Sequence, residues 1–300
     1  MAEFITPQQM SNAPVGNSGD AGDAPISDTT VSAQYPLIHL SRSGTMAVLL
    51  NNDVIVELLP ENSVRIVCPN EFAVFSDGTG KTMGILHQQG KIYKTNNTIN
   101  CVLDAQQFPR SGEEHRTKQI AFGRKGILFT MSHLKQAMFI SSVKRPNERG
   151  STWTRNGEHI STIPSEQVDF PKLDYDFTLH AFYSNERASR KMRKQSAEAV
   201  KKAEYRYENG SLNMTIGSAK IKQMATGEVR VENANYSAKC CPETQVLELR
   251  CGSTEFYIDN EGKALIKDGC RRAHGSKSGL VIGDGLDLAM VDQNGRIVGC

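Results

Sequence analysis

A short glycine-rich segment offers the first candidate chemistry in this sequence. It reads Gly78-Thr-Gly-Lys-Thr82 and resembles the end of a phosphate-binding P-loop. A complete P-loop has another glycine where this chain has Phe75, and a helix follows it so that backbone amides face the phosphates. Here the next residues, Met83 to His87, have the pattern of a strand. We therefore interpret the segment as a turn and expect no nucleotide cofactor.

Cysteines and histidines provide the second candidate. Cys270 and His274 have a spacing that zinc ligands use, and the other nearby cysteines are Cys240, Cys241 and Cys251. Zinc sites usually combine two close pairs of ligands, and two adjacent cysteines make a poor second pair. We expect no metal site and interpret these cysteines as small buried side chains. Whether the four are free thiols or ligands stays open from the sequence.

A basic cluster provides the third candidate, a site for an anion or a protein partner. Its residues are Arg187, Arg190, Lys191, Arg193 and Lys194. Charge runs of this kind usually form a solvated face, which is the interpretation we favour. Few aromatic residues lie nearby to stack on bases, so nucleic-acid binding is a lower-ranked alternative. The seven histidines are scattered singly, and no Ser-His-Asp, Cys-His or paired-carboxylate set emerges from the spacing, so we predict no catalytic residues.

The stretch from Glu204 to Asp268 organises the predicted fold. Apolar and polar residues alternate along it, which places one face of each strand on a core and the other in water. Asn209-Gly210 and Glu261-Gly262 interrupt the alternation, and glycine supplies the positive φ that tight hairpins need. The same pattern begins at Tyr35. It predicts antiparallel hairpins and meanders in both halves of the chain.

Several shorter segments receive their own predictions. Phe177 to Phe182 is expected to be a strand, Ser132 to Ile140 either a short helix or a strand, and Gly269 to Gly279 a basic loop. Asn185 to Glu204 contains no glycine or proline and is rich in good helix formers, so we predict a charged helix that links two β-rich halves. The expected organisation is an N-terminal arm at 1–34, a β-rich domain at 35–183, the helix at 184–205 and a hairpin-rich domain at 206–300.

Composition narrows the classes of function. The 35 basic and 33 acidic residues leave a net charge of +2, which gives no overall attraction to nucleic acid or to a membrane surface. No apolar run is long enough for a membrane span, and the N-terminus lacks the features of a secretory signal. We therefore expect a cytoplasmic protein with reduced cysteines. The small polar residues of 1–34 predict a disordered or extended arm, which could become ordered on a neighbouring subunit.

Several segments share the form strand, Asp/Asn-Gly turn, strand, and Leu247 to Gly262 is the clearest example. At this level the chain resembles the hairpin-rich scaffold modules of centriolar and axonemal proteins, of polo-box-like or free-standing-sheet type. It also looks like the β-rich hub and spike proteins of phage tails. The resemblance covers about half of the chain as hairpins only. It implies a structural role in a larger assembly, associated with the cytoskeleton or, as the alternative, with a virion.

We therefore predict an all-β protein of mainly antiparallel hairpins, with two β-rich halves joined by one charged helix. The expected function is that of a non-enzymatic scaffold that assembles with other proteins through sheet edges and through the N-terminal arm. The first alternative is an oligomeric virion or phage-tail component, and the second is a nucleic-acid binder that uses the basic helix. We expect protein partners, with a homo-oligomer as one option, no cofactor and no membrane association.

Overall fold

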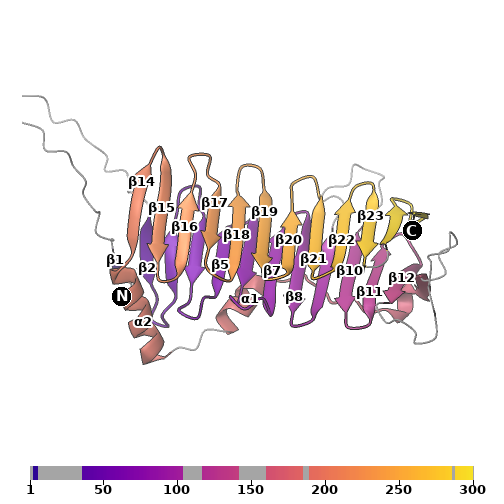
Figure 1. Ribbon diagram of the computed structural model, residues 1–300, viewed down its shortest axis with the longest axis horizontal. Coiled ribbons are helices and arrows are strands. Elements are labelled where there is room, and N and C mark those ends of the chain that lie inside the picture. Colours follow the sequence, from indigo (N-terminus) through magenta and orange to yellow (C-terminus); the bar gives the residue numbers. More distant parts are fainter. Residues whose placement is uncertain are drawn as a thin grey trace, which may run out of the picture.

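The computed structural model describes residues 3–5, 36–103, 117–141, 160–184, 189–285 and 288–299. Their strands form two antiparallel sheets of 13 and 12 strands, and every strand pairs only with the strands next to it in sequence. The two sheets lie face to face and form an elongated slab (Figure 1). This architecture confirms the predicted all-β class, with its two β-rich halves and its linking helix.

Sheet A is built from the N-terminal half of the chain. Its strands are β1 (Glu3–Ile5), β2 (Leu37–Leu40), β3 (Met46–Leu49), β4 (Ile55–Leu58), β5 (Val64–Cys68), β6 (Phe72–Ser76), β7 (Thr82–His87), β8 (Gly90–Thr95), β9 (Thr98–Leu103), β10 (Lys118–Gly123), β11 (Gly126–Met131), β12 (Gln136–Ser141) and β13 (Ile160–Pro164). A 3₁₀ turn, η1 (Ser165–Gln167), and two helices follow, α1 (Phe177–Ser184) and α2 (Arg190–Lys201). Among the described residues, neither helix is long and apolar enough to cross a membrane.

Sheet B is built from the C-terminal half. Its strands are β14 (Glu204–Glu208), β15 (Ser211–Ile216), β16 (Ala219–Gln223), β17 (Val229–Glu232), β18 (Tyr236–Cys241), β19 (Val246–Cys251), β20 (Thr254–Ile258), β21 (Ala264–Asp268), β22 (Arg271–Ser276), β23 (Gly279–Gly283), β24 (Leu288–Asp292) and β25 (Ile297–Gly299). The hairpins predicted between Glu204 and Asp268 are present in this sheet.

The two sheets share one hydrophobic core. Alternate residues of each strand point inward, as Ile221 and Gln223 do on β16, while Lys220 and Lys222 point to solvent. Fully buried members come from both sheets, including Ile85 of sheet A. Neither sheet could bury this face alone, so stacking the two meanders is what removes the apolar side chains from water.

Polar contacts also join the sheets along both long sides of the slab. On one side, the Gln223 side chain accepts a hydrogen bond from the Asn51 amide and donates one to the Asn51 carbonyl, at 3.1 and 2.9 Å. On the other side, Asp268 of β21 accepts from Lys94 of β8 at 2.8 Å and from Arg271 at 2.6 Å. Because these groups are largely buried, each needs its partner in the opposite layer or on the next strand.

The segment from Phe177 to Phe182, predicted to be a strand, is instead most of helix α1. The Asp176 carboxylate accepts a hydrogen bond from the Leu179 amide at 3.0 Å and thereby caps the helix. Phe182 packs on Phe75, which belongs to the outer face of β6. The aromatic residues suited a strand by propensity, but the cap and the outer face of sheet A stabilise a helix.

The structure also bears on four other segment predictions. Gly269 to Gly279 is not a loop, because β22 occupies Arg271–Ser276. The ambiguous segment from Ser132 to Ile140 contains strand β12. The linking helix is shorter than expected, since Glu204 already begins β14. Of the predicted N-terminal arm, Glu3–Ile5 pair with β2, and the remainder lies outside the described residues.

Candidate functional site

The end of sheet B at β14 is the candidate interaction site, and α2 positions it. The Ser189 hydroxyl caps α2 by accepting a hydrogen bond from the Met192 amide at 3.1 Å. Ser196 then donates to the carbonyl of Gly44 at 2.6 Å and ties the helix to the turn between β2 and β3. A side chain at Gly44 would meet the Arg193 backbone, so the close approach of the helix requires glycine. The helix thus takes the chain from sheet A to the start of β14.

A two-residue turn fixes the register of β14 against β15. Asn209 and Gly210 have φ values of 51° and 74°, as a type I′ hairpin requires. Glu208 pairs with Ser211 next to the turn, and Arg206 pairs with Asn213. In such a hairpin the residues that flank the turn exchange hydrogen bonds, and so does every second residue beyond them. The backbone N–H and C=O of the intervening residue Tyr205 therefore point away from β15.

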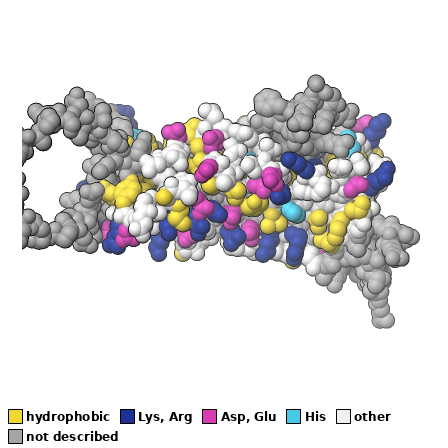
Figure 2. All heavy atoms as spheres, turned by 90° about the horizontal axis from the view of Figure 1, so that it is seen from above, with side chains coloured by type: hydrophobic (Ala, Val, Ile, Leu, Met, Phe, Trp, Pro, Cys, Tyr) yellow, Lys and Arg dark blue, Asp and Glu magenta, His cyan; other side chains and the backbone are white. Residues whose placement is uncertain are grey.

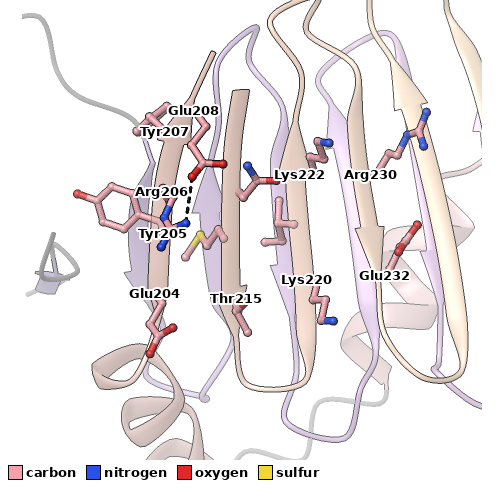
Figure 3. A pocket seen from close by; sticks show the side chains of 13 residues that line it. Glu204, Tyr205, Arg206, Tyr207, Glu208, Thr215, Lys220, Lys222, Arg230 and Glu232 are labelled. Carbon is pink, nitrogen blue, oxygen red and sulfur yellow. Dashed lines mark hydrogen bonds and ion pairs between the residues drawn. The ribbon is translucent and has the colours of Figure 1, made fainter. Parts of the chain in front are cut away.

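Side chains of β14 alternate between two different environments. Glu204, Arg206 and Glu208 are exposed on the outer face of sheet B, where Arg206 and Glu208 form an ion pair of 3.0 Å (Figure 3). Tyr205 and Tyr207 lie on the other face, with their rings edge to face at 6.1 Å. Burial, and to a smaller extent Tyr205, raises the pKa of Tyr207. The strand thus shows a charged face to solvent and an aromatic face toward sheet A.

A shallow hollow of about 1140 Å³ lies over this end of sheet B (Figure 3). Its lining combines the residues of β14 with polar residues of the next three strands, namely Asn213, Thr215, Lys220, Lys222, Arg230 and Glu232. Both signs of charge are present, and Lys220 and Lys222 point outward from β16. The hollow can therefore hold a polar chain segment or a charged partner surface.

Ion pairs continue across the outer face of sheet B. Glu228 contacts Arg230 at 2.7 Å and Lys239 at 3.3 Å. Burial raises the pKa of Glu228, but hydrogen bonds from these two cations outweigh it, so that its pKa lies below the usual value. In the view along the strands, basic and acidic side chains are interspersed along one margin of the slab (Figure 2). This face mixes both charges, without the single sign expected of a nucleic-acid surface.

The opposite end of the slab has a different character. Strand β25 ends sheet B there, and β13 ends sheet A. Ile297 and Val298 of β25 are exposed, Val298 by 64 %. The register between β24 and β25 shifts at Met290/Val291, and irregularities of this kind make an edge a poorer template for strand addition.

The basic cluster that the sequence singled out lies in the first half of α2, and β14 follows the other end of this helix. Arg190, Lys191, Arg193 and Lys194 are all exposed on the helix. Arg187 lies outside the described residues. The structure therefore places four of the five residues together on one helix, and their role in binding an anion or a partner remains a prediction.

The glycine-rich segment at 78–82 is a turn between β6 and β7. The Asp77 carboxylate accepts hydrogen bonds from the amides of Thr79, Gly80 and Thr82 at 2.8 to 2.9 Å. A P-loop directs its amides at phosphate, whereas these amides already face a carboxylate of the same chain. The turn interpretation is therefore confirmed.

The cysteines considered as zinc ligands do not converge. Cys240, Cys241 and Cys251 are buried, and Cys270 is exposed at a turn. Burial raises the pKa of the Cys240 thiol well above its ordinary range. Among the described residues, no three Cys, His, Asp or Glu side chains are close enough to hold a metal ion.

Two features of the molecule were not predicted from the sequence. Tyr205 and the charged residues of β14 were not identified as an end strand, because alternation alone does not show which strand lies last in a sheet. The contact of Lys94 with Asp268 between the layers was not predicted either. A charged residue at an inward position of a strand, such as Lys94 after Ile92, is the signal that could have found it.

A family model matches residues 36–300 of the chain, and its description is Domain of unknown function (DUF8796). The chain belongs to this family. The match spans both sheets and both helices, so the family covers the whole slab apart from β1. No curated protein matches the chain.

Three solved structures are similar to this DUF8796 chain at a low level. The wild-type TCP10 domain of Danio rerio CPAP is 9 % identical, with a TM-score of 0.24, over 77 % of this chain and 94 % of that one. A mutant of that domain is 8 % identical, with a TM-score of 0.23, over 87 % of this chain and 96 % of that one. The wild-type domain in complex with a peptide of Danio rerio STIL is 8 % identical, with a TM-score of 0.20, over 82 % of this chain and 97 % of that one. These scores denote weak fold-level resemblance between β-rich chains and support no inference about function; the virion alternative gains no support.

Proposed function

We propose that this protein is a non-enzymatic structural component that assembles with other protein chains by strand addition at the open ends of its sheets. The observation that carries this proposal is the end strand β14. Its residue Tyr205 directs a backbone donor and acceptor away from β15, and no strand of the described residues pairs with that side. An edge of this kind is a template for an added strand.

The shape of the molecule supports the same role. The slab places its apolar side chains between the layers and leaves a mixed-charge outer face on sheet B (Figures 1 and 2). The two ends then offer backbone hydrogen-bonding groups that the long faces do not. The N-terminal residues Glu3–Ile5 add a strand to sheet A next to the same end, so an arm at this end fits the proposed assembly contact.

A proline substitution tests the proposal at one donor. Tyr205→Pro removes the outward N–H and leaves the hydrogen bonds between β14 and β15 in place, as proline is tolerated at edge positions that face away from the sheet. Tyr205→Ala is the matched control for loss of the ring. We expect the native protein and the alanine variant to be recovered from their own cells bound to other chains, including a differently tagged second copy. The proline variant is expected to lose them. Equal recovery of both variants would contradict the proposal.

The exposed cations of α2 favour a second candidate, binding of an anionic partner. Arg190, Lys191, Arg193 and Lys194 form one exposed cluster on the helix. A titration of the protein with an acidic peptide or an oligonucleotide, repeated at rising salt, tests it. Binding through these charges must weaken steeply with salt, and binding that is absent or independent of salt removes this candidate.

We also propose a cytoplasmic location, with association to the cytoskeleton through the protein partners. Buried thiols such as Cys240 and Cys251 suit a reducing compartment. Imaging of the tagged protein in its own cells checks this, and recovery from the secreted fraction would contradict it.

A further inference from the structure

A small pocket lies at the margin of the slab, where α2 meets both sheets. Residues 58–60, at the end of β4, line it from sheet A, and residues 216–219, around the turn between β15 and β16, line it from sheet B. Gln195 and Ala199 of α2 form its third side, at the end of the slab where Figure 1 shows this helix. Its volume is about 200 Å³, and the described residues that line it all differ from those of the hollow over β14. We call it the margin pocket.

The margin pocket is open because a short side chain faces it from a fixed helix. The hydrogen bond from Ser196 to the carbonyl of Gly44 holds α2 against sheet A. Ala199 follows less than one turn later and packs against the core with only a methyl group. Even a Cβ added at Gly217 would lie 3.7 Å from that methyl group. The helix cannot move inward to close the space without losing its hydrogen bond to Gly44, so the pocket is a built feature of the fold.

Tyr236 of β18 gives the pocket a polar group that the fold does not use. The residue belongs to the core and is 3 % exposed, yet its hydroxyl forms no hydrogen bond with any described residue. Among the described residues, the unpartnered polar atoms that are sealed from solvent belong to His87 and His133. The Tyr236 hydroxyl is therefore not sealed, and the margin pocket, which Tyr236 lines, is where it becomes accessible. A ligand that accepts its hydrogen bond would recover the cost of leaving it unpaired.

The other walls define the chemistry of a ligand. Ser218 donates a hydrogen bond to Asn62 Oδ1 at 2.5 Å, which leaves the amide group of Asn62 without a partner among the described residues. Leu58 and Ile216 are buried and supply apolar contacts. None of the described residues that line the pocket is charged. A charged ligand would lose its hydration without gaining a counter-charge, whereas a neutral hydrogen-bond acceptor finds donors on Tyr236 and Asn62.

We propose that the margin pocket binds a small neutral molecule that combines one hydrocarbon ring or short chain with one oxygen acceptor. The size follows from the volume, since an engineered apolar cavity of about 150 Å³ holds benzene. The hydrocarbon part contacts Leu58 and Ile216, and the oxygen accepts a hydrogen bond from Tyr236. An apolar pocket with a few placed polar groups is the usual form of a small-molecule site. This inference does not depend on the proposed edge-strand function, because no residue of β14 takes part.

Three probes that share one aromatic ring test the chemistry. Benzyl alcohol carries the neutral oxygen, toluene lacks it, and benzoate replaces it with a charge. Ligand-observed NMR titrations of the full chain measure the three dissociation constants. We expect benzyl alcohol to bind at one site and toluene to bind about three- to tenfold more weakly, which is the effect of one hydrogen bond. Benzoate is expected to bind most weakly of the three.

Two variants test the position of the site. Ala199→Leu fills the pocket from the fixed helix with another good helix former, so it should abolish binding of benzyl alcohol without lowering Tm. Tyr236→Phe removes a hydroxyl that has no hydrogen bond to lose, so Tm should not fall, while the affinity for benzyl alcohol should drop to that for toluene. Tyr257→Phe is the matched control. Its hydroxyl donates to Asp259 at 3.1 Å outside the pocket, so this variant should bind benzyl alcohol as the native protein does.

Several results would overturn the inference. If benzyl alcohol does not bind up to its solubility limit, the pocket holds only solvent. Binding that survives Ala199→Leu lies elsewhere on the molecule, and equal affinities for the three probes denote non-specific contact. If Ala199→Leu fails to fold, Tyr236→Phe decides the question, because an unchanged affinity for benzyl alcohol in that variant removes Tyr236 from the site and the proposal with it.

Discussion

Replacement of Asp268 by alanine tests how the two layers are held together. Its carboxylate lies between the sheets, where it accepts hydrogen bonds from Lys94 at 2.8 Å and from Arg271 at 2.6 Å. The Lys94 and Asp268 side chains are only 11 % and 15 % exposed. The alanine variant leaves a buried ammonium group without its counter-charge, a change that typically costs about 3 to 5 kcal/mol. We expect a loss of stability in that range.

Such a loss is large compared with the stability of a typical domain, which is about 5 to 15 kcal/mol. For a chain of this size each kcal/mol shifts Tm by about 2 to 4 °C, so Asp268→Ala should lower Tm by roughly 6 to 20 °C. Urea unfolding followed by circular dichroism measures the free energy of unfolding. The combination Lys94→Met with Asp268→Leu removes both charges and should recover most of the loss.

The matched control is an ion pair of sheet B that faces solvent. Glu255 contacts Arg250 at 2.9 Å, and the Arg250 side chain is 58 % exposed. Exposed pairs contribute about 0 to 1 kcal/mol, so Glu255→Ala should change stability by no more than that. If Asp268→Ala costs no more than Glu255→Ala, the inter-sheet ion pair does not hold the layers together and the reasoning is wrong.

The lowered pKa of Asp268 leads us to expect a pH dependence of stability. Burial raises the pKa of Asp268, but hydrogen bonds from Lys94, Thr254 and Arg271 outweigh it, so that its pKa lies below the ordinary value of 3.8. A carboxyl with a lowered pKa in the folded state contributes stability that is complete above pH 3.8 and is lost as the pH falls through the folded pKa. The native protein should therefore lose stability in acid more steeply than Asp268→Ala. Parallel acid-unfolding curves would contradict this assignment.

Three further changes probe the packing and the turns. Gly84→Ala places a Cβ 2.7 Å both from the ring of Phe177 and from the carbonyl oxygen of Ile92, so it should lower stability and give faster hydrogen exchange at 177–184. Gly123→Ala, with its nearest neighbour at 3.8 Å, should change neither. Burial lowers the pKa of His87 to about 4 in the folded protein. The unfolded chain is protonated first as the pH falls from 6.5 to 4, so the free energy of unfolding should fall by about 3 kcal/mol over this range. His87→Leu should weaken this pH dependence, which urea unfolding at each pH measures. Asp77→Ala removes the acceptor of three turn amides and should cost about 1 to 3 kcal/mol in urea unfolding.

The meander was predictable because its signals are local. A two-residue turn such as Asn209-Gly210 and a period of two on each side fix a hairpin without knowledge of the rest of the chain. The same local rules failed for Phe177 to Phe182, whose helix depends on a cap from Asp176 and on the apolar outer face of β6. The apolar residues Phe177 and Ala181, four positions apart, had the helical spacing that could have indicated it.

The candidate site was harder to predict because it depends on strand order. Glu204 to Glu208 has the same alternation as its neighbours, and only the topology makes β14 the last strand of sheet B. The inward lysine Lys94 likewise gains its meaning from Asp268, 174 residues away in sequence. Contacts across a stacked pair of sheets leave no fixed spacing in the sequence, so the polar links between the layers could not be found there.

The two ends of the slab impose different limits on an assembly. At one end Tyr205 of β14 directs a backbone donor and acceptor outward, whereas the far end is formed by β13 and β25. At the far end Ile297 and Val298 are exposed, and the register between β24 and β25 shifts. Growth by strand addition is therefore favoured at the end formed by β14. The exposed apolar side chains of β25 mark the far end as a surface for a contact of a different kind.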